Sequence, residues 1–170
     1  NSFAALAYCE PRGYASRVIA LENDIKIIRA LDDVVLPETY DRYRRDVLGM
    51  IDESPEVISK DPSVLKYEKV FGMYTLTLFI GDAKETVKLL EDFGEQADVV
   101  FFDPFSLRKT PEMWSAEVFS SIFEIMRKKS VLTTYSCSKV VRTNMMHAGF
   151  FVEDGPVVGR KAPGTLAYKR

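Results

Sequence analysis

Three carboxylates stand directly after apolar runs that are typical of buried strands. Glu22 follows RVIAL, Asp82 follows YTLTLFI with only Gly81 between, and Asp103 follows VVFF. In an open α/β sheet the carboxyl ends of parallel strands share one edge, and ligands bind there. Carboxylate oxygens accept hydrogen bonds and attract cations. Three acids at one edge therefore predict a ligand with hydroxyls, amino groups or positive charge.

Each acid also has a simpler explanation. Asp82, with Glu85 three residues later, matches a capping arrangement at a helix start. Glu22 precedes an Asn-Asp pair that can cap the next helix, and Asp103 precedes a proline, a common way to begin a turn. Because the three acids occur together at predicted strand ends, a ligand-binding site is favoured over three separate structural roles.

The sequence lacks the residues and motifs that other kinds of catalytic site require. The one histidine, His147, falls near the end of a predicted helix, where a capping or surface role is expected. No GxxxxGK[ST] or GxGxxG motif occurs, which argues against ordinary phosphoryl transfer. Cys9 and Cys137 lie far apart without CxxC spacing, which predicts buried, reduced thiols in a cytoplasmic protein and no metal site.

The composition is that of an ordinary globular domain. The chain has 170 residues, 46% of them hydrophobic, and no apolar run of the roughly 18 residues that a membrane span needs. The N-terminus has no leading cations, so we expect no signal peptide. A net charge of -2 argues against a non-specific nucleic-acid coat. It leaves room for local basic patches or solvated surface at Arg42 with Arg44 and Arg45, Arg108 with Lys109, and Arg160 with Lys161.

The elements that must position these residues follow an α/β pattern. Strands are predicted at 17–21, 74–80, 98–102, 130–136, 150–153 and 165–169, and helices at 2–9, after Asn23-Asp24, and at 82–93, 115–128 and 138–148. This alternation predicts a largely parallel sheet, with the last two strands antiparallel. Residues 37–70 interrupt the rhythm and are expected to form a mostly helical insertion within a single domain, residues 1–170.

Three segments together resemble a known family. They are DPFSLRKTPEMWSAEVF, VLTTYSCSKVVRTNMMHAGFFVE and GRKAPGTLA. They are similar to the methyltransferase domain of the bifunctional tRNA-modifying enzyme MnmC, and equally to its stand-alone relatives without the oxidase domain. The similarity covers residues 74–170 well and 14–36 more loosely. It implies a Rossmann-like, class I methyltransferase that uses S-adenosylmethionine to methylate an aminomethyl group on the wobble uridine of tRNA.

The resemblance gives the acids separate roles. It implies that Glu22 binds the ribose hydroxyls of the cofactor, and that Asp82 with the backbone of Ala83 reads the adenine amino edge. Asp103 and Pro104 would face the methionine end. Asp103 would also be the catalytic residue, because a carboxylate can orient the acceptor amine, stabilise its developing charge and take its proton.

The resemblance also implies contacts to the tRNA. Phe105 would stack on the base, and four cations at the pocket mouth would touch phosphates, namely Arg108, Lys109, Arg160 and Lys161. The family usually has proline and asparagine where this chain has Leu107 and Thr110. These departures leave the exact acceptor open, and an isoelectric point of about 5.6 favours the alternative of a small amine. A non-catalytic module that binds RNA or a partner is a third reading.

One part of the family pattern is missing. Family members open with a strand and a glycine-rich loop resembling G-F-G-x-G-Y-N, whereas this sequence starts at Asn1-Ser2-Phe3, in the helix after that loop. We therefore expect the first strand and the loop to be absent from this chain. The intact acids favour a fragment over a remnant that has lost its cofactor. In either case the chain alone is expected to bind S-adenosylmethionine weakly, because the loop's glycines allow close backbone approach.

Overall fold

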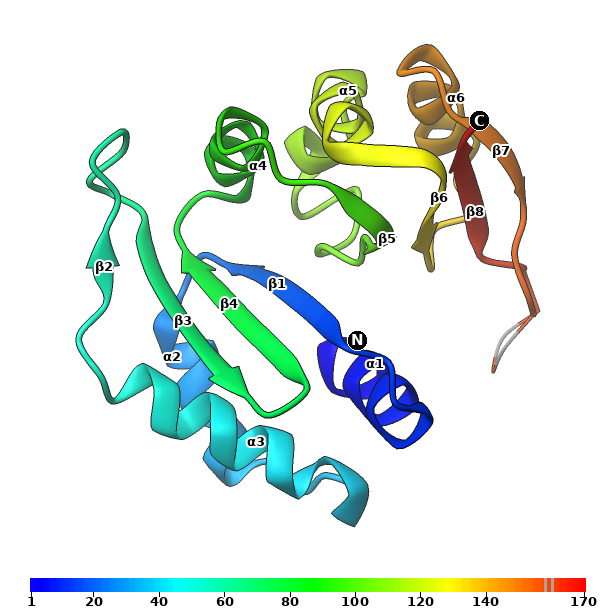
Figure 1. Ribbon diagram of the computed structural model, residues 1–170. Coiled ribbons are helices and arrows are strands. Elements are labelled where there is room, and N and C mark those ends of the chain that lie inside the picture. Colours follow the sequence, from blue (N-terminus) through cyan, green and yellow to red (C-terminus); the bar gives the residue numbers. More distant parts are fainter. Residues whose placement is uncertain (158, 160) are drawn as a thin grey trace. The chain divides into compact units, whose positions relative to one another are not determined.

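Two four-stranded sheets carry the fold (Figure 1). The structure is a computed structural model that describes residues 1–157, 159 and 161–170. The chain divides into two units, Asn1–Thr86 and Val87–Arg170, and each unit contains one of the sheets. We describe each unit by itself, since the predicted single domain over residues 1–170 stays a prediction.

The first unit is a sheet of strand order β1-β4-β3-β2 with helices around it. Its elements in chain order are α1 (Ser2–Cys9), the 3₁₀ helix η1 (Glu10–Arg12), β1 (Ser16–Glu22), α2 (Ile25–Arg29), η2 (Ala30–Asp33), α3 (Glu38–Ile51), β2 (Glu56–Val57), β3 (Leu65–Phe71) and β4 (Tyr74–Ile80). Helix α4 (Ala83–Asp92) leads into the second unit.

Strands β1 and β4 are parallel neighbours, as the sequence pattern predicts. Their register runs from Ser16 opposite Tyr74 to Glu22 opposite Ile80. The amide of Gly81 donates to the Glu22 carbonyl at 2.9 Å, which extends the pairing past both strand ends. The carboxyl ends of these two strands therefore meet at one edge of the sheet.

The expected mostly helical character of residues 37–70 is only partly correct. Helix α3 ends at Ile51, and the segment then forms β2 and β3. Strand β3 pairs antiparallel with β4 through a two-residue turn that begins at Gly72, whose φ is +59°. The missed signal is this glycine between two apolar-rich runs, a common hairpin pattern. Whether the segment is an insertion stays a prediction.

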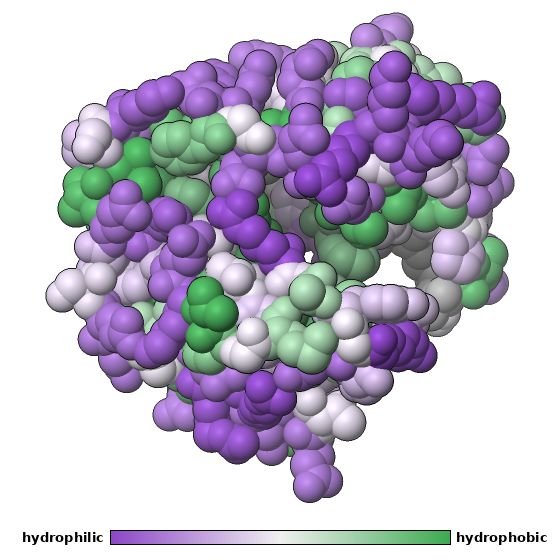
Figure 2. Space-filling model, in the orientation of Figure 1, coloured by the Kyte–Doolittle hydropathy of each residue, from purple (hydrophilic) through white to green (hydrophobic). Residues whose placement is uncertain are grey.

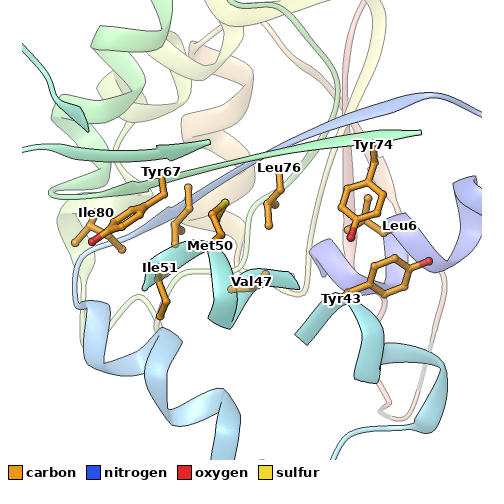
Figure 3. Close-up of a cluster of buried hydrophobic side chains, with 10 residues drawn as sticks. Leu6, Tyr43, Val47, Met50, Ile51, Tyr67, Tyr74, Leu76 and Ile80 are labelled. Atoms are coloured by element: carbon orange, nitrogen blue, oxygen red, sulfur yellow. The ribbon is translucent and has the colours of Figure 1, made fainter. Parts of the chain in front are cut away.

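Helix α3 packs its apolar face against the sheet of the first unit (Figure 3). Val47, Met50 and Ile51 belong to one buried cluster with side chains of β3 and β4, and Met50, which points toward the strands, is only 1% exposed. Burial of one such side chain stabilises a fold by roughly 1.5–3 kcal/mol. The contact between helix and sheet is therefore a main source of stability in this unit.

Two tyrosines in the same core bond to acids. The Tyr43 hydroxyl donates to Glu10 at 2.8 Å, and the Tyr74 hydroxyl bonds to Asp46. Arg42 forms an ion pair with Glu10 at 2.8 Å. Burial, followed by the bond to Glu10, raises the pKa of Tyr43 to about 12, and burial also raises the pKa of Tyr74.

The second unit is a sheet of strand order β5-β6-β8-β7. Its elements are β5 (Ala97–Phe101), the 3₁₀ helix η3 (Pro111–Trp114), α5 (Ala116–Ile125), β6 (Met126–Thr134), α6 (Lys139–His147), β7 (Phe151–Asp154) and β8 (Thr165–Lys169). Strand β8 lies between β6 and β7 and runs antiparallel to both. The antiparallel final strand is therefore confirmed.

The core of this unit is aromatic. Trp114 is 1% exposed and its ring meets Phe102 edge-on, with centroids 5.4 Å apart. Phe102 also packs on Phe119, and Phe123 on Phe150. Trp114 is thus an anchor of this core.

Several sequence predictions need correction. The sheets are not largely parallel: β1–β4 and β5–β6 are parallel, while β2–β3, β3–β4, β6–β8 and β7–β8 are antiparallel. Strand β5 is not buried, because it is the edge strand of its sheet, and Val99 is 51% exposed. Cys137 is exposed rather than buried, since it lies in the loop after β6.

Candidate functional site

Glu22 is the last residue of β1, and its carboxylate turns toward the start of α2. Its Oε1 accepts hydrogen bonds from the backbone amides of Asn23 at 2.8 Å and Asp24 at 3.1 Å. These two bonds fix the carboxylate at the strand end. Asp24, not Glu22, caps α2, through a 2.8 Å bond from the Lys26 amide.

Asp82 stands beside Glu22 at the same edge, one residue beyond Gly81. Its Oδ1 accepts a 2.8 Å hydrogen bond from the Lys84 amide, so Asp82 also caps α4, the alternative that the sequence left open. A Cβ on Gly81 would lie 2.9 Å from the side chain of Val64. Glycine is therefore needed where β4 delivers Asp82 and Ala83 to the edge.

Asp103 occupies the corresponding place in the second unit. The pairing of β5 with β6 continues to Phe102, whose amide donates to the Thr133 carbonyl at 2.9 Å. Asp103 then turns its Oδ1 to the amide of Tyr135, at 3.0 Å, just after β6 ends. Because Asp103 belongs to the other unit, its predicted convergence with Glu22 and Asp82 stays a prediction.

The segment after this acid, which we call the Asp103 loop (residues 103–110), is held at successive carbonyls. The Tyr135 hydroxyl donates to the Pro104 carbonyl at 3.2 Å. The Phe105 carbonyl accepts from Trp114 Nε1 at 2.9 Å and from the Thr110 hydroxyl at 3.0 Å. A buried indole therefore holds the backbone of a loop that carries exposed side chains.

An aromatic ring and two cations project from the Asp103 loop. Phe105 is 67% exposed, and the Lys109 ammonium lies 5.2 Å from its ring centroid. Arg108 is exposed as well. The Asp103 loop thus carries Asp103, Phe105, Arg108 and Lys109 within one short segment, and Lys109 and Phe105 lie in contact.

The remaining predicted cations lie in the β7–β8 loop (residues 155–164). Lys161 is exposed, and Arg160 lies outside the described residues. The Gly155 amide donates to the Gly164 carbonyl at 3.0 Å, which closes the base of this loop. Since Thr165 pairs with Thr134, the loop leaves the sheet at the same edge as Tyr135.

Sequence reasoning missed two residues that organise this region. Tyr135 holds the Asp103 loop through its amide and its hydroxyl, and Arg142 binds both ends of the β7–β8 loop. The rule that identified the acids did not find Tyr135, because the predicted strand 130–136 included it, whereas β6 ends at Thr134. Arg142 gave no such signal, since its partners lie 12 to 23 residues later in the chain.

Some kinds of site are not found in the described part of the chain. No group of three or more His, Cys, Asp or Glu side chains there could hold a metal ion. Within those same residues, no helix has the length and apolar character to cross a bilayer. The face shown in Figure 2 is mostly hydrophilic, with apolar residues in separate groups.

Comparison with known proteins identifies the family. Residues 54–170 match the family described as S-adenosyl-L-methionine-dependent methyltransferase. The chain belongs to this family. S-adenosylmethionine is therefore the cofactor of this methyltransferase, as the motif resemblance implied.

Relatives of the methyltransferase include proteins named tRNA 5-methylaminomethyl-2-thiouridine biosynthesis bifunctional protein MnmC. The one from Ralstonia nicotianae is 38% identical over 96 residues, which are 56% of this chain and 14% of the relative. One from Pseudomonas putida is 32% identical over 106 residues, or 62% of this chain and 16% of the relative. The resemblance to MnmC is thus confirmed, although the chain spans only a small part of these proteins.

A solved structure has the same fold. The crystal structure of MNMC2 from Aquifex aeolicus superposes with a TM-score of 0.67 and 22% sequence identity, covering 99% of this chain and 56% of that one. This similarity confirms the Rossmann-like, class I methyltransferase fold predicted from the sequence.

Proposed function

We propose that this methyltransferase N-methylates an aminomethyl group on the wobble uridine of tRNA; its MnmC relatives are named for the biosynthesis of 5-methylaminomethyl-2-thiouridine in tRNA. The observation that carries the proposal is the Asp103 loop, where a fixed carboxylate, an exposed aromatic ring and two cations occur within seven residues. A modified base on a phosphate backbone needs an acceptor for its amine, a stacking surface and cations.

The residues of the first unit suit the cofactor's nucleoside. Glu22 and Asp82 each hold one carboxylate oxygen on a backbone amide, so both side chains are oriented before a ligand arrives. Carboxylates are acceptors that match ribose hydroxyls and an adenine amino group. We assign Glu22 to the ribose, and Asp82 with Ala83 to the adenine.

The reaction needs an unprotonated amine held in line with the methyl group. When bound, S-adenosylmethionine would supply a methyl group carried on a positively charged sulfur, with a neutral thioether as the leaving group. Asp103 accepts a hydrogen bond from the amine and so orients the nitrogen lone pair toward the methyl group. It also stabilises the positive charge that develops on the nitrogen. Asp103 then takes the proton that the methylated amine releases. Pro104, held by Tyr135, shapes the wall beside it.

In this proposal the tRNA is bound by four residues, namely Phe105, Arg108, Lys109 and Lys161. Phe105 stacks on the base, and the cations position phosphates without reading sequence. Arg160 has the same proposed role. A tRNA substrate also places the protein in the cytoplasm.

Transfer of labelled methyl groups tests the proposal. The purified protein is given labelled S-adenosylmethionine with tRNA that carries 5-aminomethyl-2-thiouridine, with the same tRNA unmodified, or with a panel of small primary amines. We expect label only in the modified tRNA. Label in the small amines alone would support the alternative that the acidic isoelectric point favours. Calorimetry that detects no cofactor binding, even with a glycine-rich segment added ahead of Asn1, would leave only a non-catalytic module.

A further inference from the structure

Arg142 links the two ends of the β7–β8 loop. Its Nε donates to Thr165 Oγ1 at 2.9 Å, its Nη2 donates to the Gly164 carbonyl at 3.0 Å, and its Nη1 lies 2.6 Å from Asp154 Oδ1. Asp154 ends β7 and Thr165 begins β8, so one guanidinium spans the base of the loop. The side chain is 24% exposed, and three of its nitrogens have partners within the protein.

Thr165 extends this link toward the catalytic carboxylate. Thr165 is fully buried, and its hydroxyl donates to the Ser136 carbonyl at 2.6 Å. Ser136 directly follows Tyr135, whose amide donates to Asp103. A continuous series of contacts therefore runs from Arg142 through Thr165 and the end of β6 to Asp103, entirely within the second unit.

We propose that Arg142 is a positioning residue for the tRNA substrate, and this rests on the proposed function. It holds the two ends of the segment that carries Lys161 in fixed relation to Asp103, so that phosphate contact and amine contact occur together. A lysine cannot replace it, because one ammonium cannot reach an acid, a hydroxyl and a carbonyl in the planar, forked arrangement of a guanidinium. Arg142 itself does not touch the reacting atoms.

The variant Arg142→Lys tests this role without changing the charge. Misplacement by about 1 Å can cost on the order of 100-fold in rate. We therefore expect kcat/KM for modified tRNA to fall roughly 10- to 100-fold, with a higher KM for tRNA and an unchanged KM for S-adenosylmethionine. A merely structural role would lower the active fraction, and hence kcat, without raising the KM for tRNA.

Arg127→Lys is the matched control. Arg127 lies in the same unit and also forms an ion pair, 2.9 Å from Asp98, but at the opposite end of β6. We expect near wild-type kinetics for Arg127→Lys.

A double-mutant cycle then separates positioning from simple loss of charge. Lys161→Ala should raise the KM for tRNA several-fold in the wild type but by less than about twofold in Arg142→Lys, because the effects of residues coupled through a shared backbone shift are not additive. Additive effects, or wild-type kinetics of Arg142→Lys, would overturn the inference and leave the proposed function intact. A wild-type protein that binds S-adenosylmethionine in calorimetry but fails to methylate any tRNA would overturn both.

Discussion

The Asp103 side chain combines a structural bond with a proposed chemical task. Its Oδ1 accepts from the Tyr135 amide, so the position of the carboxylate depends in part on the residue that follows β6. An asparagine would keep an oxygen for this amide but lose the negative charge. This difference allows position and charge to be tested separately.

We expect Asp103→Asn to lower kcat by roughly 100- to 10,000-fold, the usual contribution of a general base, with little change in either KM. Steady-state methyl transfer to modified tRNA measures the effect. Asp98→Asn is the control, because Asp98 is an exposed acid of the same unit that pairs with Arg127. Normal turnover by Asp103→Asn would remove this residue from the mechanism.

The Phe105 ring is exposed, so its replacement should affect binding rather than folding. We expect Phe105→Leu to weaken tRNA binding by about 1–3 kcal/mol, the usual range for stacking of a base on an aromatic side chain. The unfolding free energy should stay unchanged. Fluorescence anisotropy with labelled tRNA measures the affinity, and Phe93→Leu, at a 45% exposed ring after α4, is the control. Equal affinities for the two variants would exclude stacking.

At the scale of elements, helix α5 begins at a well-defined cap. The Ser115 hydroxyl accepts from the Val118 amide at 3.3 Å, just after the buried Trp114. We expect Ser115→Ala to lower the free energy of unfolding by about 1 kcal/mol. Chemical denaturation measures it. Ser120→Ala, inside the same helix and exposed, should cost nothing, since alanine favours a helix interior. Similar losses in both variants would argue against a capping effect.

The contact between α3 and its sheet should weaken in alkali. The pKa of Tyr43 is about 12 in the folded protein, against about 10 when unfolded. Above pH 10 the unfolded chain loses this proton first, so stability is complete below pH 10 and falls as the pH rises through 12. We expect a loss on the order of 2 kcal/mol, measured by urea denaturation at pH 9 to 12. Tyr43→Phe should show a shallower decline, while Tyr14→Phe, at an exposed tyrosine, should decline like the wild type.

How much the sequence could predict differed between elements. Strand β4, α4 and α6 followed from periodicity and glycine signals, because those patterns are local. Strand β3 was missed, since its partner is an antiparallel neighbour and its apolar residues do not alternate cleanly. Asp103 was identified from its place after a strand, whereas Arg142 was not, because its role depends on contacts that only the folded chain forms.

At the scale of the whole molecule, β1 and β5 are edge strands of their sheets. The sequence contains no glycine-rich loop of the family pattern, and that loop would bring backbone amides close to the cofactor. We therefore expect a segment with this strand and loop, fused ahead of Asn1, to tighten S-adenosylmethionine binding at least tenfold in calorimetry. The same segment with its glycines replaced by alanine is the control. Equal affinity with and without the segment would show that the chain binds the cofactor without it.

The hydrogen bond from the Tyr135 amide to Asp103 also provides a spectroscopic probe of the proposed site. The NMR chemical shift of an amide proton that is hydrogen-bonded to a carboxylate changes when the charge or the binding partners of that carboxylate change. The chemical shift of the Tyr135 amide in isotope-labelled protein can therefore report the binding of an amine at Asp103 before methyl transfer takes place.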